Sequence, residues 1–322
     1  MRKLVIAALA LIAGAAGALA QTFPTRPITI VVPFAAGGPA DAMARVIGDR
    51  MGHSLGQQVI IEDVAGAGGS VGVGRVVRAA PDGYTVSIGH WSTHVVNGAI
   101  YDLPYDLLHD LEPVARLPAN PQFIVSKKDV PARNLKEFIA WIKANESRIS
   151  AGTAGAGSAS HVAGVYFQTM TGTHFPFVPY RGTGPAMNDL IAGQIDLIVD
   201  QTSNSMPQVK AGTIKAYAVT AKERLASAPD IPTVDEAGVP GLYISVWYGL
   251  WVPKGTPKEI IAKLNAAAVE ALADPAVKSR MGALGLEIPP REQQSAQALG
   301  ALQKAEIEKW WPIIKAAHIT GE

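Results

Sequence analysis

The chain contains no cysteine and little charge of either sign. The absence of cysteine from its 322 residues excludes disulfides, thiolate nucleophiles, zinc–thiolate sites and iron–sulfur clusters. Charged residues make up 17%, and Lys+Arg 28 against Asp+Glu 27 gives a formal net charge of +1. There is no polybasic run, so we expect neither nucleic acid nor an anionic membrane surface as a partner. The hydrophobic content of 48% is instead typical of a well-packed globular protein.

Long apolar runs are also scarce, and the clearest one stands at the N-terminus. The basic pair Arg2-Lys3 precedes an apolar run from Leu4 to Ala20, which ends in the small-x-small pattern Ala18-Leu19-Ala20. This pattern is typical of a secretory signal peptide. A membrane anchor is the alternative, but the run is short, rich in Ala and Gly, and followed by no second apolar span. We predict cleavage after Ala20 and export, to the periplasm if the source is a Gram-negative bacterium.

Short β-branched apolar runs alternate with amphipathic stretches along the rest of the chain. Strands are predicted at 28–33, 59–61, 84–88, 123–125, 195–199, 214–219 and 245–252. Helices are predicted at 39–53, 70–80 and 135–145 and over most of 256–317. One further helix is predicted after the turn at 151–161 and ends at about residue 171. This alternation predicts an α/β fold with largely parallel sheets and helices on both faces.

Two glycine-rich turns stand directly before predicted helices. The first runs from Phe34 to Asp41 and the second from Ala151 to His161. Glycine lets the backbone turn its N–H groups toward a ligand at the positive end of a helix, so each turn could hold an anion. Each could equally be a tight strand-to-helix turn and no more. The first turn lacks Lys and Arg, which favours a carboxylate over a doubly charged phosphate.

Weaker patterns suggest catalysis or nucleotide binding. The segment 68–72 matches the nucleophile elbow G-x-S-x-G, with Ser70 as the nucleophile. However, residues 62–69 separate Ser70 from the preceding strand, and a serine there fits a helix cap equally well. Val71 stands where a dinucleotide fingerprint requires its third glycine, and no P-loop sequence is present. We therefore predict no nucleotide cofactor.

The histidines of the segment 90–94 do not predict a metal site. His90 and His94 are four residues apart, but no nearby carboxylate shares their face and the segment follows a strand. The favoured interpretation places Thr93 at a helix cap and Trp91 at the rim of a cleft. We predict neither a metal ion nor another cofactor.

Several motifs occur in a fixed order along the mature chain. They are FPTRPI (23–28), VPFAAGGPAD (32–41), GAGGSVG (66–72), PDGYT (81–85), THVVN (93–97), GAGSASH (155–161), VPYRG (178–182), GQID (193–196) and WVPKGTP (251–257). In this order and spacing the chain closely resembles the Bug family, the extracytoplasmic solute receptors of tripartite tricarboxylate transporters. The resemblance spans essentially the whole mature chain.

The resemblance implies a periplasmic-binding-protein fold, in which two α/β lobes close around a central cleft. Lobe 1 would comprise residues 21–121 and 245–322, and lobe 2 residues 122–244. The chain would cross between the lobes near 120–122 and 243–247. In the family, backbone amides and hydroxyls of two facing loops hold a ligand carboxylate.

Carried over to this sequence, the resemblance implies a set of ligand-binding residues from four places. They are Phe34, Ala36, Gly37, Gly38 and Asp41 in the first loop, Thr153, Gly157, Ser158 and His161 in the second, Trp91, Ser92 and Thr93 along the cleft, and Arg181, Asp200 and Asn204 at its far end. His90-Trp91-Ser92 stands where smaller residues often precede the Thr-His pair of the family. This departure admits a larger ligand, including an aromatic carboxylate.

We therefore expect a periplasmic solute-binding receptor, not an enzyme, that captures a small di-, tri- or aromatic carboxylate. It would deliver this ligand to the inner-membrane permease of a tripartite tricarboxylate transporter, and we expect it to be a monomer. Two alternatives stay open: an exported serine hydrolase using Ser70, and a receptor-like domain that feeds a sensor.

Overall fold

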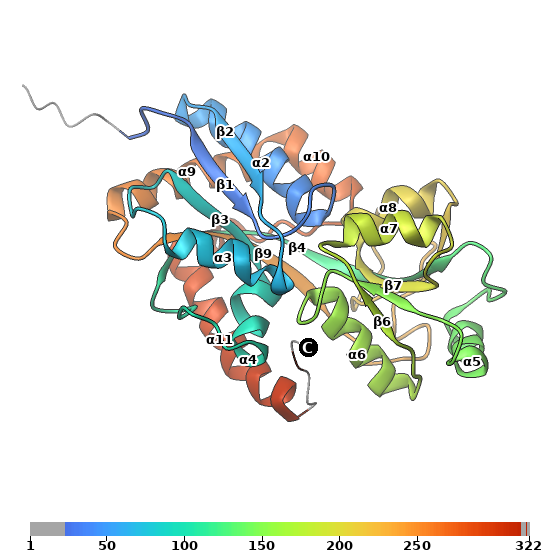
Figure 1. The fold of residues 1–322 in the computed structure, drawn as a ribbon. Helices are drawn as coiled ribbons and strands as arrows, with labels where there is room; N and C mark the ends of the chain where they lie inside the picture. The colour runs from blue at the N-terminus through green and yellow to red at the C-terminus, as the bar shows by residue number, and fades with distance from the viewer. Residues whose placement is uncertain (1–22, 317–319, 321–322) are drawn as a thin grey trace, which may run out of the picture.

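The computed structural model describes residues 23–316 and residue 320 (Figure 1). The predicted signal peptide lies outside the described residues. The strands are β1 (Ile28–Val32), β2 (Val59–Asp63), β3 (Thr85–His90), β4 (Leu111–Lys127), β5 (Ala151–Thr153), β6 (Phe177–Pro179), β7 (Leu197–Gln201), β8 (Ile214–Val219) and β9 (Ser245–Pro253). The helices are α2 (Pro39–Leu55), α3 (Ser70–Val77), α4 (Asn97–Ile100), α5 (Leu135–Asn145), α6 (Ala159–Thr171), α7 (Thr183–Ile191), α8 (Thr202–Lys210), α9 (Lys258–Ala273), α10 (Pro275–Ala283) and α11 (Ala296–Ala316). Within this part of the chain, no helix is both long and apolar enough to span a membrane.

One sheet runs through the molecule in the order β2-β1-β3-β9-β4-β7-β5-β6, with β8 also paired to β4. At one end β1 is parallel to β2 and β3, and at the other β5 is parallel to β6 and β7. The prediction of largely parallel sheets is wrong for the middle, where β9 is antiparallel to β3 and β4, and β4 is antiparallel to β7 and β8. We call the part built on β1, β2, β3 and β9 lobe 1, and the part built on β5 to β8 lobe 2.

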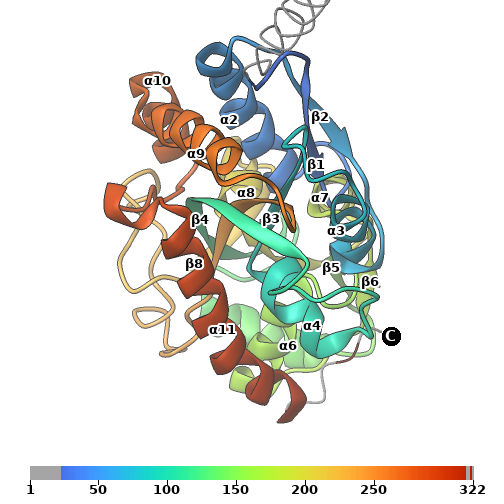
Figure 2. The same cartoon turned by 90° about the vertical axis from the view of Figure 1, so that its left-hand side faces the viewer.

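Strand β4 joins the two lobes. Up to Pro121, which lies opposite Ser245, it pairs with β9 in lobe 1. From Gln122, which lies opposite Gln201, it pairs with β7 and then with β8 in lobe 2. Figure 1 shows the lobes side by side, with β4 passing from one to the other, and Figure 2 shows the molecule with lobe 1 in front of lobe 2.

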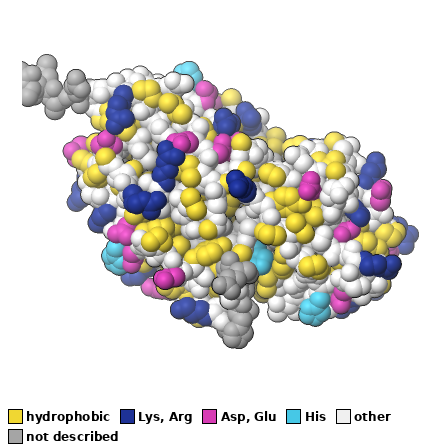
Figure 3. Space-filling model, viewed as in Figure 1, with side chains coloured by type: hydrophobic (Ala, Val, Ile, Leu, Met, Phe, Trp, Pro, Cys, Tyr) yellow, Lys and Arg dark blue, Asp and Glu magenta, His cyan; other side chains and the backbone are white. Residues whose placement is uncertain are grey.

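Each lobe has its own buried apolar core between the sheet and its helices. In lobe 1 the residues around Ile30 and Ile47 pack together, and α2 lies against α9. In lobe 2 one cluster surrounds Phe138 and another surrounds Leu190. The outer surface mixes both signs of charge, and the face in Figure 3 carries no continuous patch of either sign. The cores fix the strand ends and helix starts that meet between the lobes.

Candidate functional site

The first turns of four helices meet between the lobes. Helix α2 begins after Gly38, α6 after Ser158, α7 after Gly182 and α8 after Gln201. Residues of all four starts line one small cavity, which we call the cleft cavity: Phe34, Gly38, Pro39, Ala40, His90, Gln122, Ala154, Ser158, Ala159, Ser160, Thr183, Asp200, Gln201 and Tyr248. This lining contains no Lys or Arg. Helix N-termini carry partial positive charge and unpaired N–H groups, so the arrangement suits an anion.

Local interactions hold the two glycine-rich turns in shape. Gly37 has a φ of 83°, a left-handed conformation that favours glycine, and its N–H donates to Asp41 Oδ2 at 2.8 Å. Gly157 has a φ of 72°, and its N–H donates to Nδ1 of His161 at 3.2 Å. Ser158 caps α6 by accepting the His161 N–H at 3.3 Å. These residues shape the loops that line the cavity.

The sheet side of the cleft cavity contains polar atoms that lack partners. Gln122 is fully buried, and within the described part of the chain neither atom of its side-chain amide has a hydrogen bond. Asp200 Oδ1 is also buried without a hydrogen-bond partner there. Unpaired buried polar groups are destabilising, so a bound molecule is their expected partner.

The other oxygen of Asp200 is well satisfied. Oδ2 accepts hydrogen bonds from Asn204 Nδ2 at 2.8 Å and Ser205 Oγ at 2.6 Å. Burial raises the pKa of Asp200 to about 6, and hydrogen bonding by Ser205, Asn204, the Thr183 side chain and the Gln201 backbone limits the rise. The orientation of the carboxylate is therefore fixed.

His90 lines the cavity from lobe 1. Its ring stacks on Phe34 with centroids 5.0 Å apart, and its Nδ1 accepts the Ser92 N–H at 3.1 Å. The Thr93 hydroxyl holds the segment by donating to the His90 carbonyl at 3.1 Å. Burial lowers the pKa of His90 to about 3, so the ring is neutral at physiological pH. Because Nδ1 accepts a hydrogen bond, the ring proton belongs on Nε2, where the neutral ring can act as a donor.

The structure brings part of the predicted ligand set to the cavity. Phe34, Gly38, Ser158 and Asp200 line it. The others lie around it: Gly37, Asp41, Ser92, Thr93, Thr153, Gly157, His161 and Asn204 in supporting positions, and Ala36 and Arg181 with exposed side chains.

Sequence reasoning missed His90, Gln122, Thr183, Gln201 and Tyr248. A signal was available for two of them. His90 and Gln201 are polar residues at the carboxyl ends of strands, where α/β folds place ligands.

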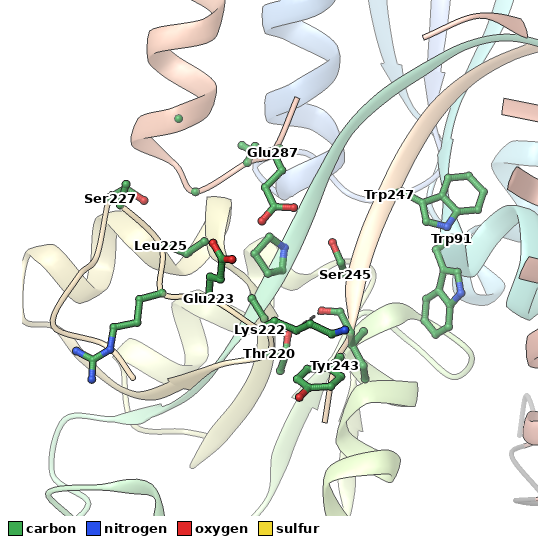
Figure 4. A pocket seen from close by; sticks show the side chains of 18 of the residues that line it. Trp91, Thr220, Lys222, Glu223, Leu225, Ser227, Tyr243, Ser245, Trp247 and Glu287 are labelled. Carbon is green, nitrogen blue, oxygen red and sulfur yellow. Dashed lines mark hydrogen bonds between the residues drawn. The ribbon is translucent and has the colours of Figure 1, made fainter. Parts of the chain in front are cut away.

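Trp91 is placed differently from the prediction that it lies at the rim of the cleft. Its indole is 1% exposed and packs edge-on against Trp310, with centroids 4.9 Å apart. It borders a groove of about 690 Å³ behind the connection between the lobes (Figure 4). Neighbouring side chains of a strand point to opposite faces. Thus Pro121 of β4 lines the groove and Gln122 the cleft cavity.

Ser70 does not have the geometry of a nucleophile elbow. Strand β2 ends at Asp63, and a 3-10 turn at Ala67–Gly69 precedes α3. The cap of α3 is Gly69, so the expectation that Ser70 caps the helix is also wrong. Among the described residues, no histidine is hydrogen-bonded to Ser70 Oγ, and no group of three or more possible ligand side chains could hold a metal ion.

The lobes are in contact across the cleft. Ala35 N–H donates to the Arg181 carbonyl at 3.0 Å, and Tyr101 Oη donates to the Ala156 carbonyl at 2.5 Å. The cleft cavity has a volume of about 20 Å³, which suffices for one water molecule. The structure is therefore a closed form, and a ligand of several carbon atoms needs a wider cleft.

Tyr101→Phe tests whether this contact stabilises the closed form. We expect the affinity for the ligand of the cleft to fall about two- to tenfold, because one hydrogen bond between the lobes is lost. Tyr105→Phe is the matched control, since Tyr105 Oη donates to Ser70 within lobe 1. Calorimetric titration measures both; equal affinities of the two variants would contradict a role for Tyr101 in closure.

Comparisons with known proteins agree with this architecture. Residues 43–319 match the model of the family described as the tripartite tricarboxylate transporter family receptor. The structure of the periplasmic binding protein BugD is similar with a TM-score of 0.90 and 39% identity, covering 92% of this chain and 99% of that chain. MatC from Rhodopseudomonas palustris, solved with bound malate, has a TM-score of 0.87 and 40% identity, covering 91% of this chain and 100% of that one.

A further R. palustris protein, solved with adipate, has a TM-score of 0.87 and 32% identity, covering 92% of this chain and 99% of its own. The predicted fold of two α/β lobes around a cleft and the resemblance to Bug proteins are thereby confirmed.

Proposed function

Since the chain belongs to the receptor family of tripartite tricarboxylate transporters, whose members are periplasmic solute-binding proteins, we propose that it captures a small carboxylate between its lobes and delivers it to the transporter's permease. The observation that carries the proposal is the meeting of four helix N-termini at a cavity lined by no cation. Malate and adipate, bound in the two R. palustris proteins, are both small carboxylates. The receptor would act without catalysis, as an exported protein cleaved after Ala20.

The proposed ligand contacts combine both lobes. Gly38 and the neutral His90 would bind from lobe 1, and Ser158, Thr183 and Asp200 from lobe 2. Gln122 would bind at the boundary, and Phe34 would supply an apolar wall. The other residues of the predicted set would hold these loops in place. The lobes would be bounded as 21–121 with 245–322 and 122–244, with hinges at 120–122 and 243–247.

The larger groove behind the hinge is a weaker candidate for this ligand. Figure 4 shows Lys222, Glu223 and Glu287 around it, so both signs of charge face the same space. It is lined by neither the α2 nor the α6 start, so the glycine-rich turns do not face it. The cleft cavity, in contrast, combines helix starts with buried atoms that need partners.

A thermal-shift screen of mono-, di-, tricarboxylic and aromatic acids tests the proposal. We expect one class to raise the melting temperature, with about 2.7 kcal/mol of added stability at a hundredfold excess over Kd. The methyl esters of the same acids should not bind, because they lack the anion that the helix starts stabilise. Equal affinity for acid and ester would contradict carboxylate recognition. Labelling of Ser70 by a fluorophosphonate, with ester hydrolysis lost in Ser70→Ala, would instead support the hydrolase.

A further inference from the structure

The groove behind the hinge has walls from both lobes. Trp247 and Leu286 on one wall belong to the core of lobe 1, and Leu225 on the other belongs to a core cluster of lobe 2. Figure 4 shows Lys222 of lobe 2 and Glu287 of lobe 1 around the same space. The groove has a volume of about 690 Å³ in this closed form. A change in the angle between the lobes must therefore change its width.

The groove and the cleft cavity lie on opposite faces of β4. Pro121 lines the groove, and its neighbour Gln122 lines the cleft cavity. Strand β4 crosses between the lobes at this point, since Pro121 pairs with Ser245 of β9 and Gln122 with Gln201 of β7. A rotation about the crossing that widens the space on one face narrows the space on the other. Opening the cleft therefore brings the walls of the groove together.

A contact between the lobes beside the crossing marks the pivot. The hydroxyl of Thr202, at the start of α8, donates to Asn120 Oδ1 of β4 at 2.6 Å and lies 3.3 Å from the Gly285 carbonyl oxygen of lobe 1. Asn120 Nδ2 in turn donates to Ser203 Oγ at 2.6 Å. A Cβ at Gly285 would lie 2.9 Å from both Thr202 Oγ1 and Leu225 Cδ1, so this end of the groove has no room left. Opening must therefore turn about this contact, and the rest of the groove must accommodate the movement.

We propose that the groove behind the hinge is the space into which the lobes rotate when the receptor opens, so that its width controls capture. Walls held apart keep the cleft closed, and walls held together keep it open. The inference rests on the proposed function in one respect, since the captured acid is what this angle retains or releases. Lys222 lies 5.5 Å from the ring centroid of Tyr243 and, among the described residues, forms no ion pair with lobe 1. The two walls are therefore free to approach each other.

Two cysteines placed across the groove can set its width, because the chain has no cysteine of its own. In Lys222→Cys/Glu287→Cys, both replaced side chains are exposed and stand on opposite walls. A disulfide is the shortest tether, and rigid bismaleimides of increasing length hold the walls progressively further apart. Small-angle scattering gives the radius of gyration of each tethered form without any acid. We expect this radius to be largest with the disulfide and to decrease as the tether lengthens.

Calorimetric titration measures capture by the same tethered forms, with malate, adipate and any acid that the thermal-shift screen identifies as probes. We expect the disulfide form to bind at least about tenfold more weakly than the reduced protein, because it no longer reaches the closed form. Reduction of the disulfide should restore the affinity. The longest tether should instead bind more tightly than the reduced protein, since a larger fraction of the molecules is closed before the acid binds.

Two further cysteine pairs complete the test. Glu223→Cys/Lys309→Cys also spans the groove and should give the same order of radii and affinities. Glu112→Cys/Lys254→Cys is the matched control within lobe 1, where the two side chains are 2.7 Å apart, and its tethers should change neither quantity. If radius and affinity do not depend on tether length in the groove pairs, the inference is overturned while carboxylate capture stands. If no acid binds to the unaltered protein, the proposed function fails, and the radius of gyration still decides the inference.

Discussion

Gly184→Val is expected to lower carboxylate affinity about a hundredfold or more, because it keeps the lobes apart. A Cβ at Gly184 would lie 2.9 Å from the carbonyl carbon of Gly37 and 3.0 Å from the backbone nitrogen of Gly38, both across the cleft. These backbone atoms cannot rotate away as a flexible side chain could. A receptor that cannot reach its closed form loses the ligand contacts of one lobe, and its apparent affinity falls with the population of the closed form.

The same substitution should leave the fold intact. The three nearest heavy atoms to the added Cβ all belong to lobe 1, so the variant is not crowded by these atoms when the lobes are apart. Gly282→Val is the matched control: Gly282 also lies in a helix, and nothing stands within 4 Å of its added Cβ. Titration calorimetry gives the affinities, and small-angle scattering reports compaction on binding. Normal affinity and normal compaction in Gly184→Val would contradict the closed arrangement described above.

Where helical or strand periodicity is uninterrupted, the sequence predicted the elements well. The helix at 135–145 and the strand at 214–219 have the predicted bounds. The long strand β4 was predicted only at 123–125. Pro113, Pro118 and Pro121 interrupt its pattern, and the register shifts after Pro113 and between Arg116 and Ala119 accommodate residues that cannot donate to a neighbouring strand.

The sequence predicted the parts of the candidate site that are formed by backbone N–H groups at helix starts. It did not predict the side chains that reach the site because they lie on one face of a strand. The glycine-rich turns predicted Gly38 and Ser158, because a strand-to-helix turn with exposed N–H groups is visible in the sequence. Gln122 was missed because nothing local shows which face of β4 turns to the cleft. His90 is the last residue of β3 and lines the cleft cavity, whereas Trp91 begins the helical segment that follows and borders the groove behind the hinge.

Lowering the pH from 7 to 5 is expected to destabilise the unliganded protein, because His90 and His94 are buried in neutral form. Burial is the main cause that lowers the pKa of each to about 3, and His94 also lies stacked 3.7 Å from Trp251. A histidine in the unfolded chain has a pKa of about 6.5. Between pH 6.5 and 3 the unfolded chain therefore binds more protons than the folded one. The stability that these rings contribute is complete above pH 6.5 and is lost as the pH falls.

The pKa shifts of His90, His94 and Asp200 together give the expected decrease in the free energy of unfolding. At pH 5 each histidine costs roughly 2 kcal/mol, from about 1.4 kcal/mol per pH unit. Asp200 acts in the opposite sense: its pKa is raised by burial to about 6, so the folded protein binds its proton first and regains about 1 kcal/mol over the same range. The net expected loss is about 3 kcal/mol, measurable by urea unfolding at pH 5, 6, 7 and 8.

His90→Gln should reduce the slope of the free energy of unfolding against pH by the contribution of about one proton. His53→Gln changes an exposed histidine and is the matched control, so its slope should stay the same. A free energy of unfolding that stays constant from pH 7 to 5, or an unchanged slope in His90→Gln, would mean that the ring of His90 is not held neutral in the fold, and its role as a neutral donor in the cleft would fail with it.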